Sequence, residues 1–226
     1  MTDSSSETMA STEKKEDESN CTLRLEKVVS SGQTGADKAA LVAAKEFGLK
    51  TGGWAVRGYI TSKGVDMDLR NFGLMELPGS NFTGKTLSYM YVCRSIKNAE
   101  DSSATLAFLF KNTPGTRNTI GYCVHGRWNA PFSYSKMALV HGVRYSEEHM
   151  RPVMVIRRSV NLDDPGRMYH FAEDARAVKF FLEKYKVKTL NVCGNREMTQ
   201  TKEFEKAVGA FLFYLFTHLG FSKSKK

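Results

Sequence analysis

Three glycine-containing turns in this sequence have the composition of anion-binding loops. Each follows an apolar run of strand length, and the first two lead directly into a helical pattern. Glycine lets a backbone approach a ligand closely, and the first N–H groups of a helix favour an anion. We therefore expect the turns to bind a phosphate-bearing ligand. They are Gly32-Gln33-Thr34-Gly35, Gly115-Thr116-Arg117 and Gly194-Asn195-Arg196.

A single Gly-x-x-Gly turn has a simpler alternative, which is an ordinary connection from a strand to a helix with Thr34 as the N-cap residue. The presence of three such turns favours one shared pocket instead. Two of them carry an arginine, Arg117 or Arg196, whose guanidinium group suits a phosphate.

The elements expected around these turns alternate between strands and helices. Continuous apolar runs are typical of strands that are buried on both faces of a parallel sheet. The pattern predicts an α/β protein, a three-layer α/β/α Rossmann-like sandwich with a mostly parallel sheet. In such sheets a ligand binds outside the carboxyl ends of the strands, where all three turns lie. The expected strands lie at 28–29, within 49–58, and at 104–110, 152–156 and 189–193; the expected helices span 36–47, 85–99, 168–185 and 202–219, with one more starting at Thr116.

Two segments depart from this alternation. Residues 59–84 contain four glycines and are expected to form a long irregular loop. Residues 127–150 are rich in aromatic residues and are expected to be an insertion, such as a lid or an oligomer contact. Near the first of these segments, Trp54 would either cover a ligand on the first turn or fill the edge of the sheet, and both interpretations stay open.

The composition predicts one ligand-binding domain over residues 23–221, flanked by two charged tails. The chain has 226 residues, of which 41% are apolar. Residues 1–20 contain six acidic residues, two lysines and no aromatic residue, so we expect a disordered acidic tail over 1–22. The chain carries a net charge of +9 and residues 1–20 carry −4, which leaves +13 for the remainder. Residues 222–226 are expected to be a basic tail.

A basic body is compatible with a nucleic acid, an acidic membrane surface or a small multi-anionic ligand, and also with a role in solubility alone. The basic residues are spread along the chain, so nucleic acid ranks last among the expected partners. The apolar run 207–219 is shorter than the roughly 20 residues that cross a bilayer, so we expect no membrane partner. The start of the chain lacks a signal-peptide pattern and the four cysteines are widely spaced, which predicts a cytoplasmic protein without a metal site.

One of the two common nucleotide-binding motifs is missing from the sequence. The dinucleotide fingerprint Gly-x-Gly-x-x-Gly does not occur, so an NAD enzyme is not favoured. The phosphate-loop pattern Gly-x-x-x-x-Gly-Lys-Ser/Thr occurs once, at Gly79–Thr86. The weak candidates for a catalytic carboxylate are Asp37 and Glu197, each of which has a surface or capping role as its alternative.

Several blocks of the sequence resemble one protein family. The segment Ser31-Gly32-Gln33-Thr34-Gly35-Ala36-Asp37-Lys38-Ala39-Ala40-Leu41, followed by Gly52-Gly53-Trp54, resembles the molybdenum cofactor carrier proteins. These belong to the Rossmann-like group that includes the SLOG and lysine-decarboxylase-like (LOG) proteins. Further resembling blocks lie at 94–106, 114–116 and 190–197, so the resemblance spans about residues 25–220.

This resemblance implies a cytosolic homo-oligomer that binds molybdenum cofactor (molybdopterin), a related pterin or a nucleotide-derived ligand. Four residues depart from the family pattern, namely Ala55, Ser103, Ala104 and Asn195, and these departures leave a different ligand open. The ligand contacts that the resemblance implies are Gly32, Gln33, Thr34, Gly35, Asp37, Gly53, Trp54, Gly115, Thr116, Gly194 and Arg196.

We therefore expect a non-catalytic binder of a phosphorylated pterin or nucleotide. The alternative of an enzyme, such as a phosphoribohydrolase that cleaves an N-glycosidic bond, remains open. The related phosphoribohydrolases place glutamates after their glycine turn, whereas Pro114-Gly115-Thr116 is followed here by Arg117-Asn118-Thr119, without an acid.

Overall fold

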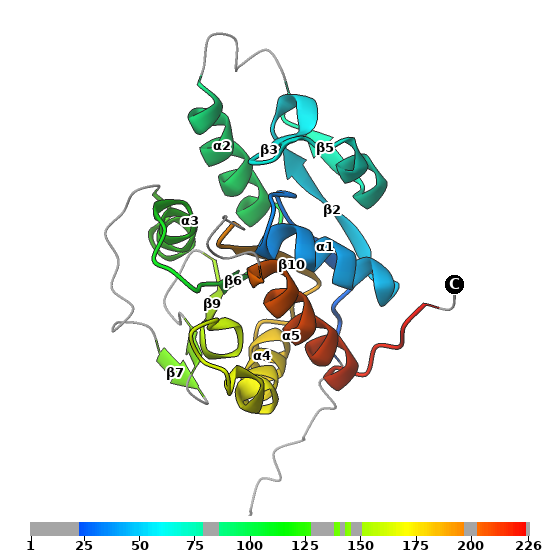
Figure 1. Ribbon diagram of the computed structural model, residues 1–226, viewed down its shortest axis with the longest axis vertical. Coiled ribbons are helices and arrows are strands. Elements are labelled where there is room, and N and C mark those ends of the chain that lie inside the picture. The colour runs from blue at the N-terminus through cyan, green and yellow to red at the C-terminus, as the bar shows by residue number, and fades with distance from the viewer. Residues whose placement is uncertain are drawn as a thin grey trace, which may run out of the picture.

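A mostly parallel sheet lies at the centre of the computed structural model, with helices on both of its faces (Figure 1). The structure describes residues 23–78, 86–127, 138–140, 143–145, 151–196 and 203–224. Within these residues the sheet has eight strands in the order β5-β2-β1-β10-β6-β9-β8-β7. The strands from β5 to β9 are parallel, while β8 pairs antiparallel with both β9 and β7. The predicted three-layer α/β/α fold is confirmed.

The strands of the sheet are short, at three to six residues each. Their bounds are β1 Lys27–Val29, β2 Lys50–Ala55, β5 Leu74–Glu76, β6 Ala104–Phe108, β7 Ala138–Val140, β8 Val143–Tyr145, β9 Val153–Ile156 and β10 Thr189–Gly194. A separate two-stranded hairpin consists of β3 Ile60–Thr61 and β4 Gly64–Val65.

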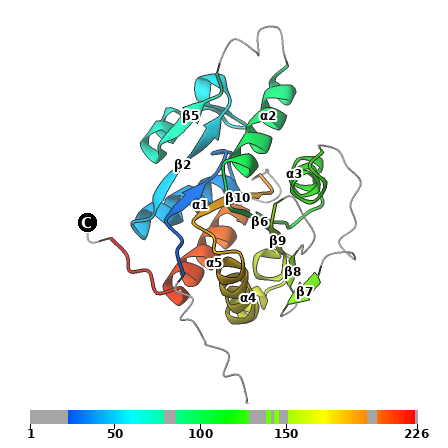
Figure 2. The ribbon, with the colours of Figure 1, turned by 180° about the vertical axis from the view of Figure 1, so that it is seen from behind.

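Two groups of helices cover the sheet (Figures 1 and 2). The first group, α1 Ala36–Glu46, α4 Phe171–Lys184 and α5 Phe204–His218, packs on one face in the largest apolar cluster. The second group, α2 Leu87–Glu100 and α3 Pro114–His125, packs on the other face. No helix in the described part of the chain has both the length and the apolarity that a membrane crossing requires.

The central strand β6 shows why the sheet is buried on both faces. Leu106 and Phe108 point into the cluster with α1, α4 and α5, whereas Ala107 points into the cluster with α2 and α3. Since successive side chains of a strand point to opposite faces, a strand that is buried at every residue needs a helical layer on each side. Burying a side chain such as Phe108 stabilises the fold by about 1.5–3 kcal/mol.

The prediction of an irregular segment over residues 59–84 was wrong for the part that is described. This part contains the β3–β4 hairpin, a 3₁₀ helix at Met67–Phe72 and the strand β5, which pairs with β2 at the edge of the main sheet. Strands of two or three residues are too short to show the alternating pattern on which a sequence-based prediction depends.

The ends of the domain and the expected insertion are described in part. Residues 1–22 lie outside the described residues. In the range 127–150, β7 and β8 continue the sheet beyond β9. In the C-terminal segment, the backbone N–H of Ser224 donates a hydrogen bond to the carbonyl of Glu46 at the end of α1.

The order of the strands predicts a crevice at the carboxyl end of β10. From β1 the chain leads through α1 to β2 on one side, and from β6 it leads through α3 and then β7 and β8 to β9 on the other. Strand β10 lies between β1 and β6. Because α1 and α3 leave in opposite directions on opposite faces, the carboxyl ends of these strands form a topological switch point, where ligands of open α/β sheets bind.

Candidate ligand-binding site

The first glycine turn, Gly32–Gly35, lies in the segment that joins β1 to α1, and hydrogen bonds connect this segment to β10. The Ser30 hydroxyl donates a hydrogen bond of 2.8 Å to the carbonyl of Val192 in β10. At the end of the turn, the N–H of Ala36 donates to the carbonyl of Asn195. The turn and the end of β10 are therefore one connected unit at the carboxyl edge of the sheet.

Asp37 lies beneath this turn and is only 5% exposed. Its carboxylate accepts a hydrogen bond from the Ser31 hydroxyl, and the backbones of Gln33 and Gly194 also hydrogen-bond to it. Burial raises the pKa of Asp37 from 3.8 to about 6, although the nearby Arg94 charge and these hydrogen bonds lower it. Asp37 thus ties the first turn to the third.

The stability of the protein should depend on the protonation of Asp37. Because the folded state binds this proton more tightly than the unfolded state, Asp37 stabilises the fold fully below about pH 4, and this contribution is lost as the pH rises through about 6. A shift of about two pKa units corresponds to about 3 kcal/mol. Urea titrations would measure the free energy of unfolding of the native protein and of Asp37→Asn. We expect the difference between them, native minus variant, to be smaller at pH 7 than at pH 4 by about this amount.

The surface substitution Asp163→Asn removes the same charge and serves as the control for this measurement. Parallel stability curves for the native protein and Asp37→Asn would contradict the role of Asp37.

Arg94 of α2 also contacts the segment that contains the first turn. It is 6% exposed, and its Nη1 donates a hydrogen bond of 3.0 Å to the carbonyl of Ser31. Its guanidinium group lies 4.7 Å from the centre of the Tyr91 ring, and its Nε has no hydrogen-bond partner in the described part of the chain. Burial lowers the pKa of Arg94 while the Asp37 charge raises it, so the two groups compensate each other in a buried setting.

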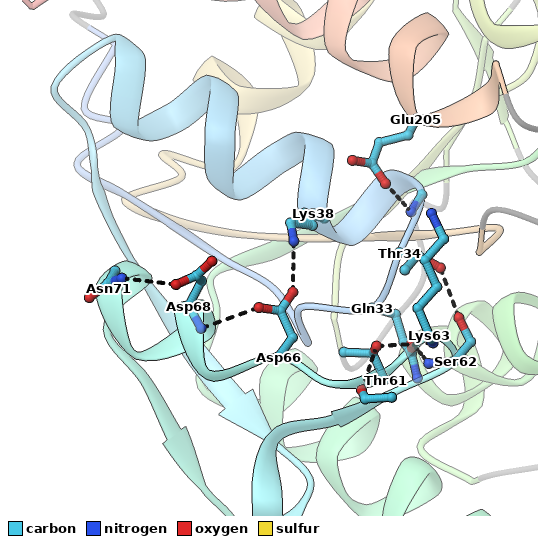
Figure 3. A network of polar contacts seen from close by, with 12 residues as sticks. Gln33, Thr34, Lys38, Thr61, Ser62, Lys63, Asp66, Asp68, Asn71 and Glu205 are labelled. Carbon is cyan, nitrogen blue, oxygen red and sulfur yellow. Dashed lines mark hydrogen bonds and ion pairs between the residues drawn. The ribbon is translucent and has the colours of Figure 1, made fainter.

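The β3–β4 hairpin covers the outer side of the first turn (Figure 3). The N–H of Ser62 donates to the side-chain oxygen of Gln33 at 2.9 Å, and the hydroxyls of Ser62 and Thr34 lie 2.9 Å apart. Just beyond the hairpin, Asp66 pairs with Lys38 of α1 at 2.7 Å. The side chains of Gln33 and Thr34 are consequently buried by protein.

The α5 helix closes the remaining side of the turn. Its Glu205 carboxylate accepts a hydrogen bond of 2.8 Å from the backbone N–H of Gly35, at the N-terminus of α1 (Figure 3). The first turn is therefore surrounded by β10, α2, the hairpin and α5.

The third turn is fixed to the second by the amide of Asn195. Its side-chain oxygen accepts hydrogen bonds from the N–H groups of Phe110 and Lys111, and its side-chain nitrogen donates to the Thr113 hydroxyl. Gly194, just before it, has no room for a side chain, since an added Cβ would lie 2.4 Å from the carbonyl oxygen of Phe108. All three turns are thereby held in one rigid arrangement.

The second turn, at the start of α3, is less enclosed by other parts of the protein than the first. An added Cβ at Gly115 would meet no atom within 4 Å, and Thr113, the N-cap residue, makes no capping hydrogen bond from its side chain. Within the described residues no group outside the helix accepts a hydrogen bond from the N–H of Gly115 or Thr116. Lys111 precedes this turn in the sequence and Arg117 belongs to it, and both are exposed.

The remaining predicted site residues lie elsewhere or are not described. The indole N–H of Trp54 donates to Asp101 at the end of α2, and the Lys97 ammonium group lies 4.6 Å from the centre of the ring, so Trp54 packs on α2. Gly53 packs against the backbone of Ser30. Arg196 is exposed after β10, and Glu197 lies outside the described residues.

Three residues contribute to the site without having been predicted to do so. Asn195 was part of the third predicted turn without a side-chain role of its own, and Arg94 appeared only at the start of a resembling block. No signal existed for Glu205, whose contact with Gly35 joins residues 170 positions apart.

Comparisons with known proteins support the family resemblance and the fold. The model of the circularly permutated YpsA SLOG family matches residues 28–134, which include the first two turns and Arg94. No curated protein matches the chain.

A solved structure named "Putative molybdenum carrier protein", from Syntrophus aciditrophicus SB, has a similar fold. The two chains share 23% sequence identity and a TM-score of 0.58, and the alignment covers 85% of this chain and 95% of that chain. At this identity the likeness shows the fold. The predicted resemblance to the SLOG proteins is confirmed for the segment from residue 28 to residue 134, which is similar to that family.

Proposed function

We propose that the protein is a non-catalytic binder of a small phosphorylated ligand of the pterin or nucleotide class. The ligand would lie in the crevice above β10, with its phosphate group at the start of α3. This proposal agrees with the SLOG-family match over the first two turns.

The observation that carries the proposal is the contrast between the closed first turn and the open start of α3. Gly115 lies exposed in the first turn of a 12-residue helix, in which Thr116 is buried and Arg117 is exposed. An N-terminus of this kind attracts an anion through its N–H groups and through the helix dipole. Asn195 holds this turn rigidly against the rest of the crevice, so little ordering is needed on binding.

Molybdenum cofactor is the specific ligand that we infer from the name of the structural neighbour. The cofactor carries a pterin and a phosphate, and the open backbone at Gly115 has space for the latter. The described residues contain no group of three or more His, Cys, Asp or Glu that could hold a metal ion. The protein would therefore recognise the organic part of the cofactor as its cargo.

The position of Asp37 argues against the hydrolase alternative. A general base must reach the proton that it abstracts, whereas the Asp37 carboxylate is buried and accepts hydrogen bonds from its own turn. Its role in this structure is to hold the backbone.

The proposal predicts that ligand binding depends on Arg117. We expect Arg117→Glu to weaken binding of the co-purifying pterin or of a nucleoside monophosphate by about tenfold or more, since a charge-assisted hydrogen bond to phosphate is lost. Bound pterin and molybdenum would be assayed in the purified protein, and affinity would be measured by thermal shift. A ligand at 100 times its Kd should stabilise the native protein by about 2.7 kcal/mol.

The matched control is Arg176→Glu, which makes the same charge change on the exposed face of α4. Equal affinities for the native protein and Arg117→Glu would contradict the proposed site. A native protein that contains no ligand and gains no stability from any pterin or nucleotide would contradict the proposed function itself.

A further inference from the structure

We propose that Glu205 is a specificity-determining residue that closes the first turn to phosphate groups. It would thereby confine the ligand's phosphate to the start of α3 and select ligands with one anionic end. This inference rests on the proposed function for the identity of the ligand, while the role of Glu205 at the turn can be tested alone.

The first observation is that the Glu205 carboxylate already stands where an anion would bind. Gly35 is the N-cap residue of α1, and its N–H donates to Oε2 of Glu205 at 2.8 Å. A negative charge at this position is stabilised by the dipole of the 11-residue helix. The Glu205 carboxylate therefore occupies this helix N-terminus in the place of an external anion.

The second observation is that other N–H groups around the turn are also occupied by a carboxylate. The backbones of Gln33 and Gly194 hydrogen-bond to Asp37. A phosphate placed over the turn would face the Glu205 carboxylate, and like charges repel each other. By contrast, no described carboxylate forms an ion pair with Arg117 or Lys111 at the start of α3.

The third observation is that Glu205 borders open space and is not sealed in the core. A cavity of about 320 Å³ lies on the outer side of the turn, and its lining includes Thr34, Lys38, Lys63, Asp66 and Glu205. Figure 3 labels these side chains. Lys38 pairs with Asp66 at 2.7 Å, and Lys63 is a second cation of the lining. Removing the Glu205 side chain would thus leave room for a phosphate at the Gly35 N–H without opening the core.

These three observations assign different roles to the two helix N-termini of the crevice. The start of α3 takes the phosphate, and the first turn faces a neutral part of the ligand that can donate hydrogen bonds, such as the ring of a pterin or purine. A ligand with phosphate groups at both ends would place one of them against Glu205. The preferred class is therefore a monophosphate with a neutral head group.

The test uses inorganic phosphate as the probe and the ¹⁵N-labelled full chain as the protein. In the native protein, phosphate should shift the amide resonances of Gly115 and Thr116 and leave that of Gly35 unchanged. In Glu205→Ala, phosphate should also shift the Gly35 resonance, and the shift should saturate as the phosphate concentration rises. The control Glu203→Ala removes the same charge from the exposed N-cap of α5 and should behave as the native protein does.

Two results would overturn the inference: a shift of the Gly35 resonance by phosphate in the native protein, or no response of Gly35 in Glu205→Ala. If the alanine variant does not fold, Glu205→Ser removes the charge and leaves the same space open, and the same two readings apply to it. Absence of any response at Gly115 and Thr116 would count against the proposed function, whereas the Gly35 readings would still decide the role of Glu205.

Discussion

Replacing Gly53 by alanine is expected to destabilise the protein by about 4 kcal/mol. An added Cβ would lie 2.2 Å from the carbonyl oxygen of Ser30 and 2.8 Å from the side-chain oxygen of Asn98. The first contact is with backbone, so relief would require β1 and β2 to move apart. Gly53 also has a φ of +126°, which an alanine rarely adopts. Backbone strain costs about 1–3 kcal/mol and overpacking about the same, so the two together reach the expected value.

Urea denaturation of the two proteins would measure this difference, with Gly209→Ala as the control. Gly209 lies within α5, and an added Cβ there would meet nothing within 4 Å, so alanine should stabilise the helix by about 0.5–1 kcal/mol. A Gly53→Ala variant within 1 kcal/mol of the native protein would show that β1 and β2 tolerate a side chain between them. The expected loss would mean that Gly53 is required by the fold, whatever it contributes to a ligand.

The architecture was predictable because it depends on long apolar segments. β6 and β9 are continuous apolar runs, and the helical stripes of α1 and α4 extend over three turns or more, so their type could be predicted from local sequence. The edge strand β5 has three residues, Leu74–Glu76, of which Leu74 alone is buried. Its pairing with β2 depends on the arrangement of the whole sheet, which a three-residue pattern does not encode.

The position of the site was predictable from the sequence, whereas the charged side chains that contact the first turn were not. Parallel strands end at the same edge, so the three glycine turns were expected to meet, and hydrogen bonds of Asn195 and Ala36 now connect them. The state of each turn depends instead on partners that are distant in sequence. Glu205 reaches Gly35 across 170 positions and Arg94 reaches Ser31 across 63, so only the packing of α5 and α2 reveals that the first turn is closed.

The Arg94→Met variant should lose about 4 kcal/mol of stability at pH 7. Methionine can fill the space of the Arg94 stem, so the loss would come mainly from leaving the buried Asp37 charge without its compensating neighbour, which typically costs 3–5 kcal/mol. The loss should become smaller toward pH 4. Because the Arg94 charge lowers the pKa of Asp37, its removal raises that pKa further above 6, and the folded variant then holds Asp37 in its neutral form over a wider pH range.

Urea titrations at pH 4 and pH 7 would measure both parts of this expectation. Lys97→Met provides the control, since Lys97 lies one turn further along α2 with 37% of its side chain exposed and should cost at most about 1 kcal/mol. The double variant Arg94→Met/Asp37→Asn should recover most of the stability, because it removes the charge that Arg94 compensates. A loss that is equal at both pH values, or one that the double variant does not reduce, would mean that Arg94 acts through its hydrogen bond to Ser31 and its packing on Tyr91. The charge of Asp37 would then be compensated from elsewhere in the turn.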